Sequence, residues 1–277
     1  MLPTFLVIGA QKSGTTSLHA YLASHPRVFM SEPKELDFFP AERNWGRGLR
    51  WYERHFERAE GHDAVGEASP SYSMDPLFPG VPGRIATVLP ECRLVYVMRH
   101  PVERTRSHYL HRVWRGYESR PIEDALFAYP PYVDNSRYAH QISRYLEHFP
   151  RERLLLITAE RLRSDREAVI GSVLEFLGIR DTLLEADFGE EHHRAADKRV
   201  PALFGPRLRR TPLFRAAARI APRRVKEGYM RRMARPLEPS RADMSEDLRR
   251  RLEDVLAEDM RGLVPLMDPG FDAWGLG

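Results

Sequence analysis

Short apolar runs alternate with amphipathic stretches over the first 180 positions of the chain. Brief, near-continuous apolar runs are typical of strands buried on both faces, and apolar residues at helical spacing are typical of helices that cover a sheet. The expected strands are 2–9, 28–30, 64–66, 93–98 and 154–158. The expected helices are 15–24, 84–89, 101–114, 137–149, 165–177 and, in the tail, 245–264. This alternation predicts an α/β fold of three layers, with a central, mostly parallel sheet flanked by helices.

The chain is expected to form one domain over residues 1–277, with an α/β core at about 3–180 and a basic, helical lid region at about 190–277. Within that region the segment 207–235 is strongly basic and has a single acid, Glu227. Its basic residues stand at 207, 209, 210, 215, 219, 223, 224, 226, 231, 232 and 235. Three interpretations stay open: a solvated face or lid, a site for an anionic acceptor, or a peripheral contact with an acidic membrane.

Composition narrows the class of protein. Of 277 residues, 42% are apolar and 30% charged, which is enough apolar surface to bury a core and excludes wholesale disorder. The formal charge of +4 and the pI of about 9.3 favour anionic partners. Cys92 is the only cysteine, so the chain cannot form an internal disulfide. No apolar run approaches the ~18 residues that span a bilayer, and we therefore expect a cytoplasmic protein without stable membrane insertion.

The stretch Gly9–Ser17 carries the candidate chemistry. It joins an expected strand to an expected helix, where backbone N–H groups and the helix N-terminus form an anion site. Gly9 and Gly14 permit a tight turn, and Thr15, Thr16 and Ser17 add hydroxyl donors.

The spacing differs from that of a nucleoside-triphosphatase loop, G-x-x-x-x-G-K-[ST]. Here the residue after Gly14 is Thr15, and the lysine comes earlier, at Lys12. The strand at 93–98 is followed by Arg99, where such enzymes hold their metal with an Asp. An early lysine and an extra arginine favour a metal-free transfer of a group that carries less charge than a phosphoryl group.

Two motifs together resemble those of sulfotransferases that use 3′-phosphoadenosine-5′-phosphosulfate (PAPS). Gln11-Lys12-Ser13-Gly14-Thr15-Thr16-Ser17-Leu18 is similar to the loop that binds the 5′-phosphosulfate, and 99–109 is similar to the 3′-phosphate motif. The resemblance implies a P-loop-like fold in which Arg99 and Ser107 hold the 3′-phosphate, Lys12 neutralises the leaving phosphate, and adenosine 3′,5′-bisphosphate is the product. It implies no metal.

Two further stretches, 33–39 and 66–72, are similar to motifs of the heparan-sulfate branch. Golgi members of that branch carry a membrane anchor that is not seen in this sequence, and we therefore expect a soluble bacterial-type relative. By that resemblance Glu67 is the general base and Lys34 lies near the transferring group. We expect Lys34 and the aromatic Tyr72 to contact the acceptor. A basic pair, Lys198 and Arg199, stands where relatives close a loop on the nucleotide. The acceptor is then a small molecule, a sugar or a lipid, and no nucleic acid.

Two other function classes stay open on the sequence. A small-molecule kinase of the P-loop class would require Mg²⁺-dependent binding of ATP. A non-enzymatic protein that binds polyanions would depend on the basic segment 207–235.

Overall fold

A computed structural model describes residues 1–180, 199–201, 234–236 and 239–276. Five strands form one sheet in the order β2-β3-β1-β4-β5, and every pairing within it is parallel. Their bounds are β1 Phe5–Gly9, β2 Val28–Met30, β3 Ala64–Ala68, β4 Arg93–Met98 and β5 Leu154–Thr158. The predicted parallel sheet is confirmed.

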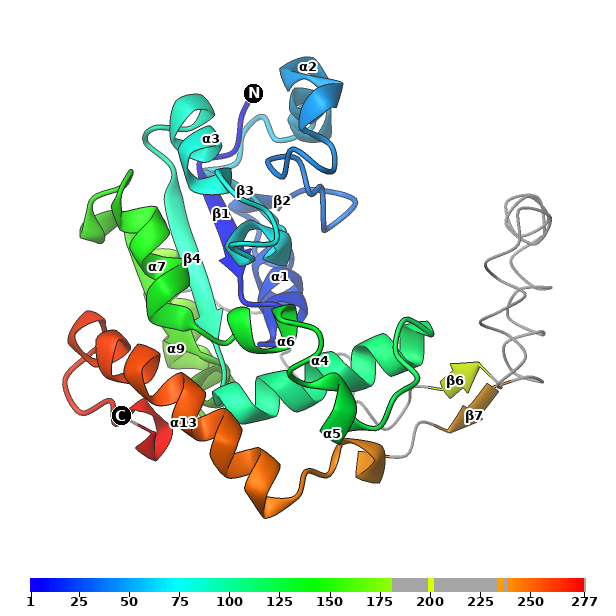
Figure 1. Cartoon of the computed structure of the whole chain (residues 1–277). Helices are drawn as coiled ribbons and strands as arrows, with labels where there is room; N and C mark the ends of the chain where they lie inside the picture. The colour runs from blue at the N-terminus through cyan, green and yellow to red at the C-terminus, as the bar shows by residue number, and fades with distance from the viewer. Residues whose placement is uncertain (181–198, 202–233, 237–238, 277) are drawn as a thin grey trace, which may run out of the picture.

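Helices cover both faces of this sheet, which gives three layers (Figure 1). Val7 and Val95 pack with Leu18 of α1 and Val173 of α9 on one face. The helices concerned are α1 Thr15–Ala23 and α9 Arg166–Phe176 on this face, and α3 Val81–Val88 and α7 Tyr138–Leu146 on the other. Successive residues of a strand point to opposite faces of the sheet, and helices cover both faces. The residues on each face must therefore be apolar, which explains the near-continuous apolar runs.

The opposite face of the sheet packs against α3 and α7. Leu6 and Tyr96 belong to a cluster that includes Ile85 of α3 and Ile142 of α7. Trp274, near the carboxyl end of the chain, joins this cluster and contacts the ring of Tyr138 at 6.0 Å between centroids. Trp274 therefore packs against the body of the fold.

A smaller core lies below the sheet in the view of Figure 1, between α4 and α13. Its helices are α4 Pro101–Arg115, α5 Ile122–Ala125, α6 Pro131–Asp134 and α13 Glu246–Leu263. The apolar stripe of α13, with Leu248, Leu252 and Leu256, faces this core. Ser245 caps the helix by accepting the N–H of Leu248 on its hydroxyl at 3.2 Å.

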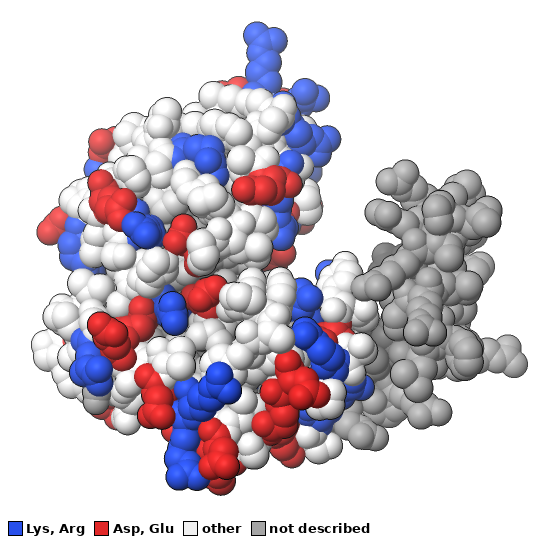
Figure 2. Space-filling model, in the orientation of Figure 1, with Lys and Arg blue, Asp and Glu red and all other residues white. Residues whose placement is uncertain are grey.

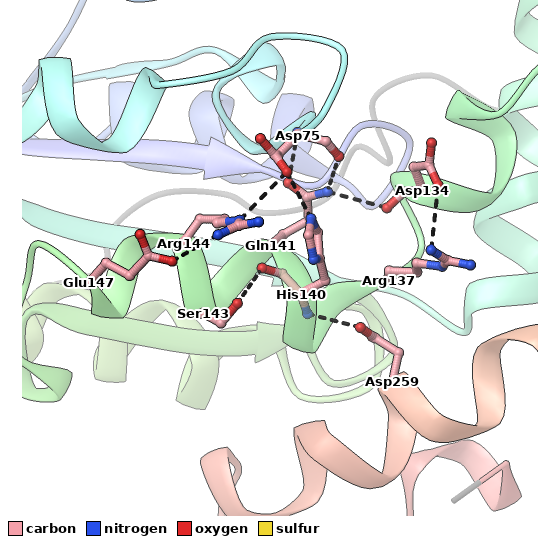
Figure 3. A network of polar contacts seen from close by, with 9 residues as sticks. All are labelled: Asp75, Asp134, Arg137, His140, Gln141, Ser143, Arg144, Glu147 and Asp259. Carbon is pink, nitrogen blue, oxygen red and sulfur yellow. Dashed lines mark hydrogen bonds and ion pairs between the residues drawn. The ribbon is translucent and has the colours of Figure 1, made fainter.

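Polar contacts also tie α13 and α7 to the segment after β3 (Figure 3). Asp259 of α13 accepts the N–H groups of Ala139 and His140 at the start of α7, at 2.9 and 2.8 Å. His140 in turn lies 2.8 Å from Asp75, and Gln141 binds the backbone of Asp75 through both its amide atoms. The chain just after residues 67–73 is therefore bound by α7, and α7 is bound in turn by α13.

Short elements complete the described chain. The remaining α-helices are α2 Leu49–Glu53 and α8 Ala159–Ser164. The 3₁₀ turns are Trp45–Arg47, Arg54–Phe56, η3 Pro70–Ser73, Arg151–Arg153, Pro239–Ala242, Val264–Leu266 and Ala273–Gly275. Two short strands, β6 Arg199–Pro201 and β7 Ala234–Pro236, pair antiparallel, and β6 lies beside α4.

Basic and acidic side chains are interspersed on the face shown in Figure 2, outside the grey residues. Several pair directly, as Arg106 does with Asp243 at 2.8 Å and Arg249 with Glu253 at 2.9 Å. The described part of this face therefore offers no broad field of one sign. Among the described helices, none combines the length and apolar character that crossing a bilayer requires.

Candidate active site

The predicted site residues gather where the parallel strands end. In a parallel sheet the carboxyl ends of all strands meet at one edge, which is where open α/β folds bind ligands. The loop 10–14 follows β1, the loop 31–37 follows β2, the turn 69–73 follows β3, and Arg99 follows β4. In Figure 1 the β1 and β4 arrows point toward this edge, above α4 and α6.

The loop after β1 has the backbone of an anion site. Gly14 is the N-cap of α1 in the left-handed region, with φ of 100°, and it has no side chain to cap the first turn. A Cβ at Gly9 would lie 1.9 Å from Oγ of Ser73, so glycine is required there by the close approach of η3. The structure confirms the geometric roles predicted for both glycines.

The predicted loop residues lie just before α1 and in its first turn. Lys12 has a positive φ of 72° and is half-buried. Ser13 and Thr15 are buried and Thr16 is exposed. The two remaining loop residues of the prediction, Gln11 and Ser17, are half-buried.

Arg99 lies next to this loop. The N–H of Ala10 donates to the carbonyl of Val97 at 2.6 Å, which joins the start of the loop to the end of β4. The hydroxyl of Tyr138 donates to the carbonyl of Arg99 at 2.6 Å and fixes its backbone. The Arg99 side chain is 26% exposed and lies 3.6 Å from Glu103.

Ser107 lies on α4, the helix that begins shortly after Arg99, and it is half-buried. The structure thus places the loop and Arg99 at one edge, with Ser107 on the helix that starts there. Their contact with a nucleotide stays a prediction.

Lys34 lies in the loop after β2, beside α1. Its ammonium group is 3.0 Å from Glu35, and the two side chains are 18% and 54% exposed. Burial chiefly lowers the pKa of His19 on α1, and the charge of Lys34 lowers it further, so Lys34 lies close to that helix. The loop therefore brings one cation and one reachable carboxylate to this edge.

Glu67 is enclosed by hydroxyl groups. Leu6 of β1 pairs with it in the sheet, and its side chain is 0% exposed. Tyr52 and Tyr72 each donate to Oε1 at 2.6 Å, and Ser69 donates to Oε2 at 2.7 Å. Burial raises the pKa of Glu67 to about 7, and these three donors limit the rise.

This geometry does not support the role expected for Glu67. A general base must come within hydrogen-bond reach of the proton that it removes. In this structure the carboxylate is 0% exposed and accepts the hydroxyls of Tyr52 and Tyr72, whereas its pKa of about 7 would suit a base. The role of Glu67 as general base stays a prediction.

Tyr72 is buried as well, and its expected contact with the acceptor stays a prediction. Its side chain is 2% exposed, and its hydroxyl is used by Glu67 and by the N–H of Phe38. Its ring packs edge-on against Phe39 at 5.3 Å between centroids. Tyr72 is a core residue in this structure.

Two basic features of the carboxyl-terminal third are only partly covered. Lys198 and most of the segment 207–235 lie outside the described residues. Arg199 opens β6, which lies beside α4, and nothing is described of its side chain. Their proposed roles stay predictions.

Sequence reasoning missed the residues that surround Glu67. Tyr52 and Ser69 bind its carboxylate, and Asp37 lies in the adjoining loop. One signal was available: alternation along β3 places Glu67 on the same face as Val65, which predicts burial. Tyr52 lies 15 residues away, and no local pattern predicts its contact.

The described residues contain no group of three or more His, Cys, Asp or Glu side chains arranged to hold a metal ion. His192 and His193 lie outside the described residues.

Comparison with known proteins now adds to this geometry. Residues 2–196 match the family described as Sulfotransferase domain. The chain belongs to the sulfotransferase family. Membership confirms the resemblance drawn from the two phosphate-binding motifs, and it leaves the kinase alternative without support.

The chain is also similar to human enzymes that are named for heparan sulfate. It is 31% identical over 201 residues to the human bifunctional heparan sulfate N-deacetylase/N-sulfotransferase 3, covering 64% of this chain and 22% of that protein. It is 29% identical over 198 residues to human heparan sulfate glucosamine 3-O-sulfotransferase 3B1, covering 68% and 49%. The chain thus spans between about a fifth and a half of the length of these relatives.

A solved structure matches nearly the whole chain. The crystal structure of a sulfotransferase from Alicyclobacillus acidocaldarius aligns with a TM-score of 0.72 at 25% identity and covers 99% of both chains. This similarity confirms the P-loop-like α/β fold.

Proposed function

We propose that the protein transfers the sulfuryl group of PAPS to an acceptor hydroxyl. One observation carries the proposal: Lys12 and the N-terminus of α1, which has no side-chain cap, lie at the sheet edge where Arg99 follows β4. Such an arrangement suits an anion. Family membership supports the same reaction.

The residues fit a nucleotide with two anionic ends. The first-turn N–H groups of α1 and the hydroxyls of Thr15 and Thr16 suit a phosphosulfate, because aligned N–H dipoles favour negative charge. The guanidinium of Arg99 suits the 3′-phosphate, since its planar donors match phosphate oxygens. Ser107 and the basic pair Lys198 and Arg199 are assigned to the same nucleotide.

The transfer breaks the bond between sulfur and the bridging phosphate oxygen and forms one between sulfur and the acceptor oxygen. Negative charge grows on the leaving phosphate, and Lys12 neutralises it there. By analogy with phosphoryl transfer, positioning and charge stabilisation supply most of the acceleration.

The acceptor proton must pass to a base, and two carboxylates are compared for that role. The resemblance implies Glu67, which is covered, whereas Glu35 is exposed beside Lys34. The variants Glu67→Gln and Glu35→Gln distinguish the two carboxylates. We expect the variant that lacks the base to lose about 10²- to 10⁴-fold in turnover rate and to keep its affinity for the nucleotide.

The acceptor is proposed to be a sugar hydroxyl. The support is similarity to enzymes named for heparan sulfate and its glucosamine. Labelling of a glycolipid or a secondary metabolite instead would be a different outcome of the same assay.

The test is transfer from ³⁵S-labelled PAPS to a panel of oligosaccharides, glycolipids and phenols, with EDTA present. We expect labelled product from at least one oligosaccharide and none from Lys12→Ala above about 1% of the wild-type rate. If no acceptor is labelled and the protein also fails to bind adenosine 3′,5′-bisphosphate, the proposal is refuted.

A further inference from the structure

One buried carboxylate is linked to the backbone of the loop that carries Lys34. The hydroxyl of Tyr72 donates to Glu67 and accepts the N–H of Phe38 at 3.0 Å. The hydroxyl of Ser69 donates to Glu67 and accepts the N–H of Asp37 at 3.0 Å. Two consecutive N–H groups of the loop are thus connected to Glu67 through two hydroxyls.

The direction of these bonds depends on the charge of Glu67. An ionised carboxylate can only accept hydrogen bonds, so the hydroxyls of Tyr72 and Ser69 must each donate their single hydrogen to it. Their lone pairs then accept the N–H groups of the loop. Hydrogen bonds to an ionised group are also the stronger ones. The carboxylate therefore sets the orientation of both hydroxyls, and these hydroxyls hold the loop.

The loop adopts a conformation that requires such support. Asp37 has a positive φ of 47°, which is uncommon for a residue with a side chain and persists where surrounding contacts enforce it. Its carboxylate accepts the hydroxyl of Ser71 at 2.6 Å and pairs with Arg43. Lys34 and Glu35 precede this point by three and two residues, respectively.

We infer that Glu67 is a positioning residue: through the hydroxyls of Tyr72 and Ser69 it fixes the loop that holds Lys34 and Glu35 at the reaction edge. This inference rests on the sulfuryl transfer proposed above, and it replaces the direct removal of a proton by Glu67. Glu67 then acts on the reaction through loop geometry.

Tyr52 provides a matched control. Its hydroxyl donates to the same oxygen of Glu67 at 2.6 Å, and its ring stacks on Phe38 at 4.4 Å between centroids. Tyr52→Phe removes one donor and keeps the ring, and it leaves both relays to the loop intact. Tyr72→Phe also keeps its ring but breaks the relay to Phe38.

The first measurement is amide hydrogen exchange at Asp37 and Phe38 in the full chain, with nucleotide affinity as a check on the rest of the site. We expect Tyr72→Phe to speed exchange at Phe38, and Ser69→Ala to speed it at Asp37, each by about tenfold or more. Tyr52→Phe should leave both amides within about twofold of wild type. Equal effects of Tyr52→Phe and Tyr72→Phe on Phe38 would refute the relay.

The second measurement separates positioning from proton removal by comparing Glu67→Gln with Glu67→Ala. Glutamine keeps an acceptor oxygen for the two tyrosines, so we expect its kcat/KM for the acceptor to exceed that of the alanine variant about tenfold or more. A base would make both variants equally inactive while exchange at Asp37 and Phe38 stayed normal, and this result overturns the inference. Failure of the wild-type protein to bind the nucleotide would instead overturn the proposed function.

Discussion

Three ionisable side chains at the carboxyl edge of the sheet differ in how much solvent they meet. Lys12 is half-buried and Arg99 is 26% exposed, whereas Glu67 is 0% exposed. A cation that meets solvent can approach a substrate anion, and a covered carboxylate acts first on its neighbours. The sequence shows all three residue types equally well, and only packing separates them.

At this scale Lys12→Ala should lower kcat by about 10²- to 10³-fold, because the charge it neutralises grows only as the sulfur–oxygen bond breaks. Its affinity for adenosine 3′,5′-bisphosphate should change far less than that of Arg99→Ala. Single-turnover kinetics with labelled PAPS, beside calorimetric titration of both variants, measures the difference. A Lys12→Ala variant with normal kcat would remove this lysine from the transfer step.

At the scale of elements, regular patterns were predictable and long-range contacts were not. All five strands of the sheet were expected, because each is a short apolar run that can be recognised from its local sequence alone. The short helices α2, α5, α6 and α8 were missed, because four to six residues carry too little periodicity to detect.

The same distinction applies to the site. The loop 11–17 could be predicted because its chemistry is contiguous in sequence. The contact of Tyr52 with Glu67 could not, since it depends on how the chain between β2 and β3 folds back over the sheet.

The cap of α7 provides a test of these long-range contacts. Asp259 accepts two N–H groups at the start of α7 from a helix about 120 residues away in sequence. Asp259→Ala should lower the free energy of unfolding by about 1–2 kcal/mol, as expected for a lost cap. Denaturant unfolding measures this, with Asp254→Ala, an exposed acid on the same helix, as the control. If both variants lost a similar amount of unfolding free energy, the contacts of Asp259 with α7 would have no special role in stability.

At the scale of the whole molecule, the charge of Glu67 links the site to stability. Its pKa is raised from the ordinary value of 4.5 to about 7, so the folded protein binds this proton more tightly than the unfolded chain does. The contribution is present below about pH 4.5 and is lost as the pH rises through 7. Activity that requires the ionised form is thus obtained at a cost in stability.

The cost should reach about 3 kcal/mol at pH 8, from the conversion of a pKa difference into free energy. The glutamine in Glu67→Gln cannot ionise, so this variant lacks the loss of stability that the wild-type protein undergoes between pH 5 and pH 8. The free energy of unfolding of the variant should therefore rise relative to that of the wild-type protein over this range. Urea denaturation at both pH values measures this difference. The contributions of the other titratable groups are the same in both proteins and cancel. Parallel pH profiles would contradict the raised pKa.

The central claim is that the edge formed by the loop after β1 and by Arg99 binds a 3′-phosphorylated adenine nucleotide without a divalent ion. Titration calorimetry with adenosine 3′,5′-bisphosphate in EDTA tests it most directly, because no acceptor is needed. We predict one nucleotide per chain, binding weakened at least about tenfold in Arg99→Ala, and no comparable binding of ATP with Mg²⁺. Absence of binding in EDTA, or equal affinity in Arg99→Ala, would contradict the account.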